Sequence, residues 1–526
     1  MEKRGSVRNV LFIMCDQLRV DYLSCYGARH LDTPNIDKMA SRGTRFDAAY
    51  VAAPVCGPSR MSFYTGRYVL SHGATWNFVP LPVGERTLGE YLRPAGVRTA
   101  VVGKTHYAPD LAGMQELGIV ATEGAGLLIA EGGFEPYARD DGLHPEGRNA
   151  PHAAYNHFLR AKGYSGANPW HDYANSGIDE AGKLASGWLL RNSHRAARIP
   201  DELSETAWTV DRAIDFIHEQ GEAPWCLHVS FIKPHWPYIV CAPYHDRFGS
   251  DDAPPAVRSG IERETANPVF KGFQAHPEGI AFSRDEVRLN VVPAYMGLVS
   301  QIDAHLGRLI TALDRNSRAA DTLIIFTADH GDYLGDHWQG EKEMMYEQGV
   351  RMPLIIVDPS MDGAGRVSSE LVEAVDVVPT VLDALGLTVP VHIIEGRSLM
   401  PLVRGAGEPW SREAVFSEMD YAIYPTARRL GIGPREARMV MVRCDRWKLV
   451  DYGKGLPPQL FDLENDPMEF EDLGAAAALK AVRDEMYGRL FDWMRARRNR
   501  IAMSDEAVAR RPSPSGAGGG VTIGVW

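Results

Sequence analysis

Buried strands that end in polar residues constrain the fold of this sequence more than any other feature. Four apolar runs have the length and composition of buried strands, and helical patterns at 87–93, 203–217 and 295–313 lie between them. The runs, each with the polar residues that follow it, are 9–14 with Asp16, 97–102 with Lys104, 225–231 with Lys233 and His235, and 322–327 with Asp329 and His330. In open α/β sheets, ligands bind at the carboxyl ends of the parallel strands. We therefore expect an α/β fold with a large, mainly parallel sheet, flanked by helices, that carries a site along this edge.

The rest of the sequence divides into an insertion, a second subdomain and a tail. Residues 110–200 are rich in Gly, His, Asn and Trp and show little periodicity, so we expect an insertion or lid over the sheet edge. The pattern then changes to short strands and one helix, which predicts a smaller α+β subdomain at 411–497 beside a catalytic α/β domain at 1–410. Prolines and a glycine run predict an extended tail at 498–526, which we expect to contact a partner subunit in a homo-oligomer.

The composition excludes several classes of protein. The 526 residues carry a net charge of −12, which argues against general attraction to nucleic acid or to an anionic membrane. No run approaches the roughly 18 apolar residues of a membrane span, and the run 10–14 is too short for the apolar part of a secretion signal. We therefore expect a cytoplasmic protein whose six cysteines are thiols rather than a disulfide framework.

The most specific motif is Cys56-Gly57-Pro58-Ser59-Arg60, followed by Thr65-Gly66-Arg67. Taken alone, Cys56 has a second interpretation, a buried structural cysteine beside a turn-forming proline. The complete motif resembles the C-x-P-S-R…T-G signature of the formylglycine-dependent sulfatases, members of the alkaline phosphatase superfamily. The resemblance implies an alkaline-phosphatase-like fold, and it implies that a formylglycine-generating enzyme oxidises Cys56 to formylglycine. In this family the hydrated aldehyde is a geminal diol, of which one hydroxyl attacks sulfur and the other later expels the sulfate.

Two further motifs resemble the metal site of the same family. Asp16-Gln17 follows the first predicted strand, and Asp329-His330 follows a later one. Such residues often only cap turns, but here the resemblance implies one divalent metal ion with the ligands Asp16, Gln17, Cys56, Asp329 and His330. Many sulfatases have paired aspartates in the first motif and Asp-Asn in the second, whereas Gln17 and His330 resemble the phosphonate monoester hydrolase and choline-sulfatase-like branches. A histidine ligand shifts the preference from Ca²⁺ towards Mn²⁺, and both ions stay open.

A third set of residues is basic and would surround a tetrahedral anion. It comprises the G-K-x-H element with Lys104 and His106, the K-P-H element with Lys233 and His235, Lys342 thirteen residues after Asp329, and Arg60 and Asn77. Singly, each lysine is most often a solvated surface residue and each histidine a structural one. At the family's spacing they predict preorganised donors for the ester, with Arg60 and Lys104 among the catalytic residues. In the roles that the resemblance implies, His106 is the base, His235 and Lys342 serve the leaving group, and Asn77 and Lys233 bind the substrate.

The sequence favours hydrolysis of small-molecule sulfate monoesters, in the manner of an arylsulfatase. Lys104 and His106 favour this function, because phosphonate monoester hydrolases have uncharged residues there. The alternative is a phosphonate monoester or phosphodiester hydrolase, which Gln17, His330 and the V-P-L segment after Asn77 favour. Sulfuryl and phosphoryl transfer share tetrahedral anions and loose transition states, so one site can serve both. A third interpretation is an idle member that binds anions without turnover.

Overall fold

The computed structural model describes residues 7–142, 153–265, 267–361, 365–406 and 409–510. Within these residues the main sheet has eight strands in the order β11-β2-β10-β9-β1-β8-β4-β5. In that order their bounds are Arg366–Ser368, Thr44–Phe46, Leu354–Val357, Thr322–Ala328, Asn9–Asp16, Trp225–Pro234, Arg98–Gly103 and Glu135–Arg139. The strands from β9 to β5 are mutually parallel, and β10 is antiparallel to both of its neighbours. The expected fold class, a large and mainly parallel α/β sheet, is confirmed.

The four strands predicted from the sequence are neighbours in the middle of this sheet. Each of them extends one to three residues beyond its predicted end. Strand β1 runs as far as Asp16, which pairs with Pro234 of β8, so the backbone ladder continues into the polar residues. Because these strands are parallel, their carboxyl ends and polar side chains meet at one edge of the sheet.

Apolar layers cover both faces of the sheet. In β1, residues Val10, Phe12 and Met14 belong to one hydrophobic core, and Leu11, Ile13 and Cys15 belong to the other, as the two-residue period of a strand requires. Burial on both faces explains why such a strand is a continuous apolar run. The first core includes residues of α2 (Cys56–Thr65), α4 (Leu88–Leu92) and α14 (Val377–Ala384); the second includes residues of α1 (Pro34–Arg42), α8 (Glu205–Glu219) and α12 (Asp285–Arg315).

The helix boundaries follow local capping. Helix α8 begins after Ser204, whose hydroxyl accepts a hydrogen bond from the Ala207 N–H at 3.2 Å. Helix α4 begins after Thr87, whose N–H donates to the Glu90 carboxylate at 3.0 Å. Helix α12 starts ten residues before the predicted pattern and contains Pro293. No helix of the described segments combines the length and the apolar character that a membrane crossing needs.

The region 110–200 is not only an insertion. It contains α5 (Leu111–Glu116), α6 (Gly124–Ala130), β5, α7 (Ala154–Ala161), β6 (Ser176–Ile178) and β7 (Leu184–Ser186). Strand β5 pairs with β4 and forms an edge of the main sheet, so the insertion interpretation is wrong for 135–139. The sequence pattern did not predict this strand, because it is short and half-buried and contains Pro136, which an edge strand tolerates. Residues 143–152 lie outside the described part.

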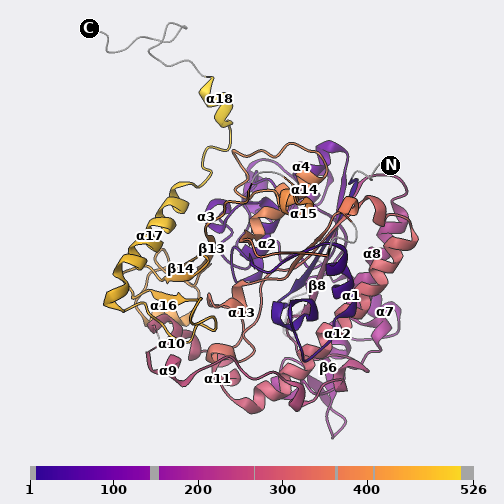
Figure 1. Ribbon diagram of the computed structural model, residues 1–526. Coiled ribbons are helices and arrows are strands. Elements are labelled where there is room, and N and C mark those ends of the chain that lie inside the picture. Colours follow the sequence, from indigo (N-terminus) through magenta and orange to yellow (C-terminus); the bar gives the residue numbers. More distant parts are fainter. Residues whose placement is uncertain (1–6, 143–152, 266, 362–364, 407–408, 511–526) are drawn as a thin grey trace.

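The C-terminal part is built around a four-stranded antiparallel sheet. Its strands are β13 (Val415–Asp420), β14 (Arg438–Arg443), β15 (Trp447–Asp451) and β16 (Gln459–Asp462), and helix α17 (Lys480–Arg495) packs against them. In Figure 1, α18 (Asp505–Ala509) stands away from the body. Residues 511–526 of the expected tail lie outside the described residues, and its contact with a partner stays a prediction.

The remaining α-helices and strands of the described residues are short. They are β3 (Ala49–Tyr50), α3 (Val69–His72), α9 (Gly260–Thr265), α10 (Pro268–Gln274), α11 (Pro277–Phe282), α13 (Glu347–Val350), β12 (Val372–Glu373), α15 (Met400–Arg404) and α16 (Pro425–Arg429). All six cysteines are free thiols in the structure.

Candidate active site and metal centre

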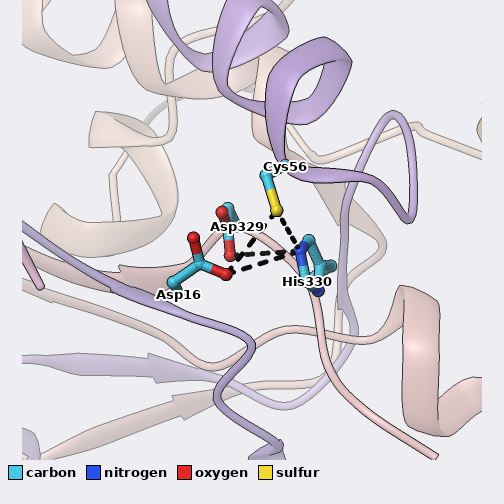
Figure 2. Close-up of side chains that lie close together, drawn as sticks. All are labelled: Asp16, Cys56, Asp329 and His330. Atoms are coloured by element: carbon cyan, nitrogen blue, oxygen red, sulfur yellow. Dashed lines mark hydrogen bonds and ion pairs between the residues drawn. The ribbon is translucent and has the colours of Figure 1, made fainter. Parts of the chain in front are cut away.

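Four buried side chains converge where β1 and β9 end and α2 begins (Figure 2). Asp16, Cys56, Asp329 and His330 each offer one ligand atom, and these atoms all lie within 4.8 Å of one another. The Cys56 Sγ lies 3.2 Å from the His330 Nε2 and 3.7 Å from an Asp16 oxygen. The predicted edge of the sheet therefore brings together four of the five predicted metal ligands, one of which, Cys56, is also the candidate nucleophile.

Cys56 is the first residue of α2, and the next residue fixes this end of the helix. The N–H of Gly57 donates a hydrogen bond to the Asn77 Oδ1 at 2.7 Å. A Cβ atom at position 57 would lie only 2.8 Å from that oxygen, so a glycine is needed here. The amino-terminal end of a helix carries a partial positive charge, which favours negative charge on the Cys56 side chain. Asn77 therefore positions the nucleophile helix, and its Oδ1 is already engaged.

Gln17, the fifth predicted ligand, is held at the rim of this cluster. Its backbone is left-handed (φ 65°), and its N–H donates to the Asp329 Oδ1 at 3.0 Å. Its side-chain amide donates to the Tyr238 hydroxyl and to Asp332, so its Oε1 faces the Lys342 Nζ at 3.0 Å. Sequence reasoning missed Tyr238 and Asp332, although Asp332 lies within the same motif as Asp329.

Arg60 lies behind the cluster and not in front of it. Its guanidinium donates to Asp329 at 2.7 Å, to Asp16 at 3.1 Å, to the Lys104 carbonyl at 2.9 Å and to the Ser230 hydroxyl at 2.7 Å. The residue is fully buried, and these bonds occupy most of its donors. Arg60 therefore orients the two carboxylates that face the nucleophile, and its contact with the anion stays a prediction.

Removing Arg60 should destabilise the fold. In Arg60→Met, the buried Asp16 and Asp329 lose a shared cation, so we expect the free energy of unfolding to fall by about 3–5 kcal/mol. The measurement is urea unfolding in the presence of a chelator, so that no bound ion compensates. Arg195→Met is the control, because its partner Glu180 is 83% exposed and its loss should cost under about 1 kcal/mol. Equal, small losses in both variants would contradict this role.

Three further predicted residues face the nucleophile. The Lys104 Nζ lies 2.6 Å from the Asp16 Oδ2. The Lys342 Nζ lies 3.5 Å from the Cys56 Sγ and 3.3 Å from the His235 Nε2. Both lysines are buried, so their charges act at low dielectric. The structure thus brings Lys104, His235 and Lys342 around position 56, as the sequence predicted.

These cations change the acidity of the thiol. Burial raises the pKa of the Cys56 thiol, but the charges of Lys342, Lys104 and His330 outweigh burial and hold the pKa well below its usual range. The pocket therefore stabilises negative charge at the side chain of position 56. An oxyanion at the same position would be stabilised for the same reason.

His106 reaches the site from a loop that a partly buried carboxylate, Asp141, organises. The N–H groups of Thr105 and His106 both donate to the Asp141 Oδ1, at 2.8 and 2.9 Å. Burial raises the pKa of Asp141, but Arg139 and these N–H groups hold it below its usual range. Neither ring nitrogen of His106 has a hydrogen-bond partner among the described residues, and the ring is close enough to Cys56 to lower the pKa of the thiol. No motif pointed to Asp141, because it lies in the region that was interpreted as an insertion.

Lys233 is not brought to the nucleophile. Its Nζ donates to the Asn175 Oδ1 at 2.7 Å and to the Pro237 carbonyl at 2.8 Å, and burial lowers its pKa to about 8. The pairing of β8 with β1 is irregular at this point, since Cys15 pairs with Phe231 but Asp16 pairs with Pro234, and the Lys233 side chain lies beside Asn175 and Pro237. The structure shows Lys233 bonded to Asn175 and Pro237, and its contact with the substrate stays a prediction.

The donor set fits a divalent metal ion. The His330 Nδ1 lies 2.8 Å from the Gly331 carbonyl and donates to it, so Nε2 is the nitrogen that faces the cluster and would bind a metal ion. Burial lowers the pKa of His330, but Asp329 and Cys56 raise it to about 9, so the cluster favours a positive charge at this point. In both carboxylates, one oxygen binds Arg60 while the other faces His330. Two carboxylates, an imidazole and the nearby Gln17 amide are a donor set for a hard or intermediate dication.

Comparisons with known proteins place the chain in a family. The family described as Sulfatase matches residues 8–387, and the family described as N-sulphoglucosamine sulphohydrolase, C-terminal, matches residues 335–496. The multifunctional alkaline phosphatase superfamily protein PehA of Trinickia caryophylli is 29% identical over 552 residues, which cover 97% of this chain and 98% of that protein. An arylsulfatase of Clostridium perfringens is 28% identical over 93% of this chain and 92% of its own length. The solved phosphonate monoester hydrolase SpPMH from Silicibacter pomeroyi has a TM-score of 0.82 at 27% identity, covering 95% of this chain and 98% of that one.

Proposed function

The chain belongs to the sulfatase family and is a sulfuric ester hydrolase, and on this premise we propose that it uses a formylglycine derived from Cys56 and one divalent metal ion. The observation that carries the proposal is the convergence of Asp16, Cys56, Asp329 and His330 within 4.8 Å, beside two buried lysines. The substrates are sulfate monoesters of small molecules, and phosphonate monoesters are the alternative substrates of the same site.

The metal would be held by Asp16, Asp329, His330 and the Gln17 oxygen, together with the side chain at position 56. Its chemistry would be to lower the pKa of the attacking hydroxyl and to polarise the ester oxygen. The mixed oxygen and nitrogen donors support Mn²⁺ over Ca²⁺. Lys104, bonded to Asp16, adds positive charge beside the position of the sulfate group.

Lys342 is placed to stabilise the leaving group. Burial, together with the charge of Lys342, lowers the pKa of His235 to about 3, so its imidazole is neutral. The His235 Nδ1 lies 2.7 Å from the Trp236 carbonyl and donates to it, so its Nε2 accepts from the Lys342 ammonium. Lys342 therefore donates to the leaving oxygen, and His235 orients the Lys342 ammonium. His106 lies beside position 56, and its ring nitrogens make no hydrogen bond to another described residue, so it is the base that removes a proton there.

A kinetic comparison tests the preferred substrate. We expect kcat/KM for 4-nitrophenyl sulfate to exceed that for 4-nitrophenyl phenylphosphonate, because the buried Lys104 ammonium supplies a charged donor beside the ester. Both reactions release the same chromophore, so they are measured under identical conditions with one preparation. The proposal fails if the phosphonate has clearly the higher kcat/KM and the sulfate is barely turned over.

The second candidate function rests on specific residues. Gln17 and His330 stand where many sulfatases have Asp and Asn, and the structure of a phosphonate monoester hydrolase is similar over most of the chain. Both observations support turnover of phosphonate monoesters as an additional activity. We further propose that a formylglycine-generating enzyme matures the chain, and that the mature protein is a cytoplasmic homo-oligomer.

A further inference from the structure

A residue of the C-terminal subdomain forms a hydrogen bond to the segment that carries Lys342. The hydroxyl of Tyr424, which precedes α16, donates to the Glu343 Oε1 at 2.8 Å. The other oxygen of Glu343 accepts the backbone N–H of Lys342 at 3.0 Å. The Glu343 carboxylate therefore links the C-terminal subdomain to the backbone of the lysine that faces the nucleophile.

The ring of Tyr424 is itself fixed by aromatic neighbours. It meets Trp76 edge-on at a centroid distance of 5.2 Å and stacks with His276 at 5.3 Å, and Phe273 lies 5.0 Å away. Such contacts hold a ring in one orientation, so its hydroxyl has a defined direction. Trp76 directly precedes Asn77, which holds the first turn of α2, so the same ring also supports the nucleophile helix.

The position of the Lys342 ammonium is closely defined. It donates to the Gln17 Oε1 at 3.0 Å and lies 3.3 Å from the His235 Nε2 and 3.7 Å from the Glu341 Oε2. A long lysine side chain has many rotamers, so this geometry depends on where its backbone is anchored. A displacement of about 1 Å in a donor to the reacting atoms is enough to lower a rate substantially.

We propose that Tyr424 is a positioning residue of the active site. Acting through Glu343, it sets the point at which the Lys342 ammonium meets the leaving oxygen of the ester, and it does not touch the reacting atoms itself. The inference rests on the proposed function of Lys342. It makes the C-terminal subdomain a part of the catalytic machinery and predicts a kinetic effect that depends on the leaving group.

Tyr424→Phe tests the inference, because it removes one hydroxyl and keeps the ring contacts. For phenyl sulfate, whose leaving oxygen develops much negative charge, we expect kcat to fall about 10-fold, the value of one hydrogen bond to a charged group. For 4-nitrophenyl sulfate, whose leaving oxygen develops less negative charge and needs less stabilisation, we expect kcat to fall only about 2-fold. KM should stay within about 2-fold for both esters, because uniform binding is not altered.

Two variants accompany the test. Tyr421→Phe removes a hydroxyl that donates to the Tyr452 carbonyl at 3.3 Å in the same subdomain, and it should leave the ratio of the two kcat values unchanged. Glu343→Gln should reproduce the leaving-group dependence of Tyr424→Phe. An equal fall for both esters, or no fall for either, would overturn the inference, and thermal unfolding of each variant shows whether it is folded. Failure of the proposed function would be seen differently, as a wild-type protein that turns over neither ester.

Discussion

Cys56→Ala is expected to lower kcat/KM for an aryl sulfate by on the order of 10⁴-fold or more, which is the size of the loss when a covalent nucleophile is removed. The side chain of Cys56 is buried among Asp16, Asp329, His330 and two lysines, and none of the three hydrophobic cores includes it. The variant should therefore fold, and its loss of activity would report on chemistry. The measurement is steady-state hydrolysis, together with urea unfolding of both proteins.

A second cysteine supplies the matched control. Cys25 is half-buried beside the core on the other face of the sheet, and Cys25→Ala should retain the wild-type kcat/KM. Peptide mass spectrometry of the active wild-type protein should find an aldehyde in place of the thiol at position 56 and an unchanged thiol at position 25. Hydrolysis that survives in Cys56→Ala would remove this residue from the mechanism. An unmodified thiol in an inactive protein from its native host would favour an idle, anion-binding member.

The fold followed from the sequence to a large extent, because its central strands are buried on both faces. A strand such as β1 cannot expose alternate residues, so it is a continuous apolar run that ends where the chain reaches the polar edge. Asp16, Lys104, His235 and Asp329 follow such runs, and parallel pairing brings them to one place. By contrast, β5 is a half-buried edge strand without a clear hydrophobic period, so the sequence pattern did not predict it.

The parts of the site that the sequence did not predict have physical causes as well. Lys233 belongs to a motif that resembles the family, but β8 departs from regular pairing beside it, and its ammonium binds Asn175. Arg60 lies one helical turn after Cys56, and only the fold shows that two carboxylates occupy its guanidinium. Asp141 acts through hydrogen bonds to a distant loop, and no local pattern predicts such a partner.

Asp329→Asn should remove most of the bound metal and lower kcat/KM by about 10³-fold, since a metal that stabilises charge in the transition state contributes several kcal/mol. One oxygen of Asp329 accepts the Arg60 Nε–H at 2.7 Å, and the other lies 3.7 Å from the His330 Nε2. An asparagine keeps the shape but replaces one of these oxygens by an NH₂ group. The cluster then loses a negative charge that a dication needs, while three cationic groups remain around it.

The same substitution should also lower the free energy of unfolding, by about 1–3 kcal/mol, because the new NH₂ group must face either the Arg60 guanidinium or the Gln17 N–H. Metal per protein chain is measured by elemental analysis after growth with Mn²⁺, and stability is measured by urea unfolding in chelator. Asp201→Asn is the control, since this half-buried carboxylate binds His305 and Gln301, which are not among the site residues. A variant at 329 with full metal content and full activity would show that Asp329 is not a ligand, and the centre would then have to be built from Asp16 and His330 without it.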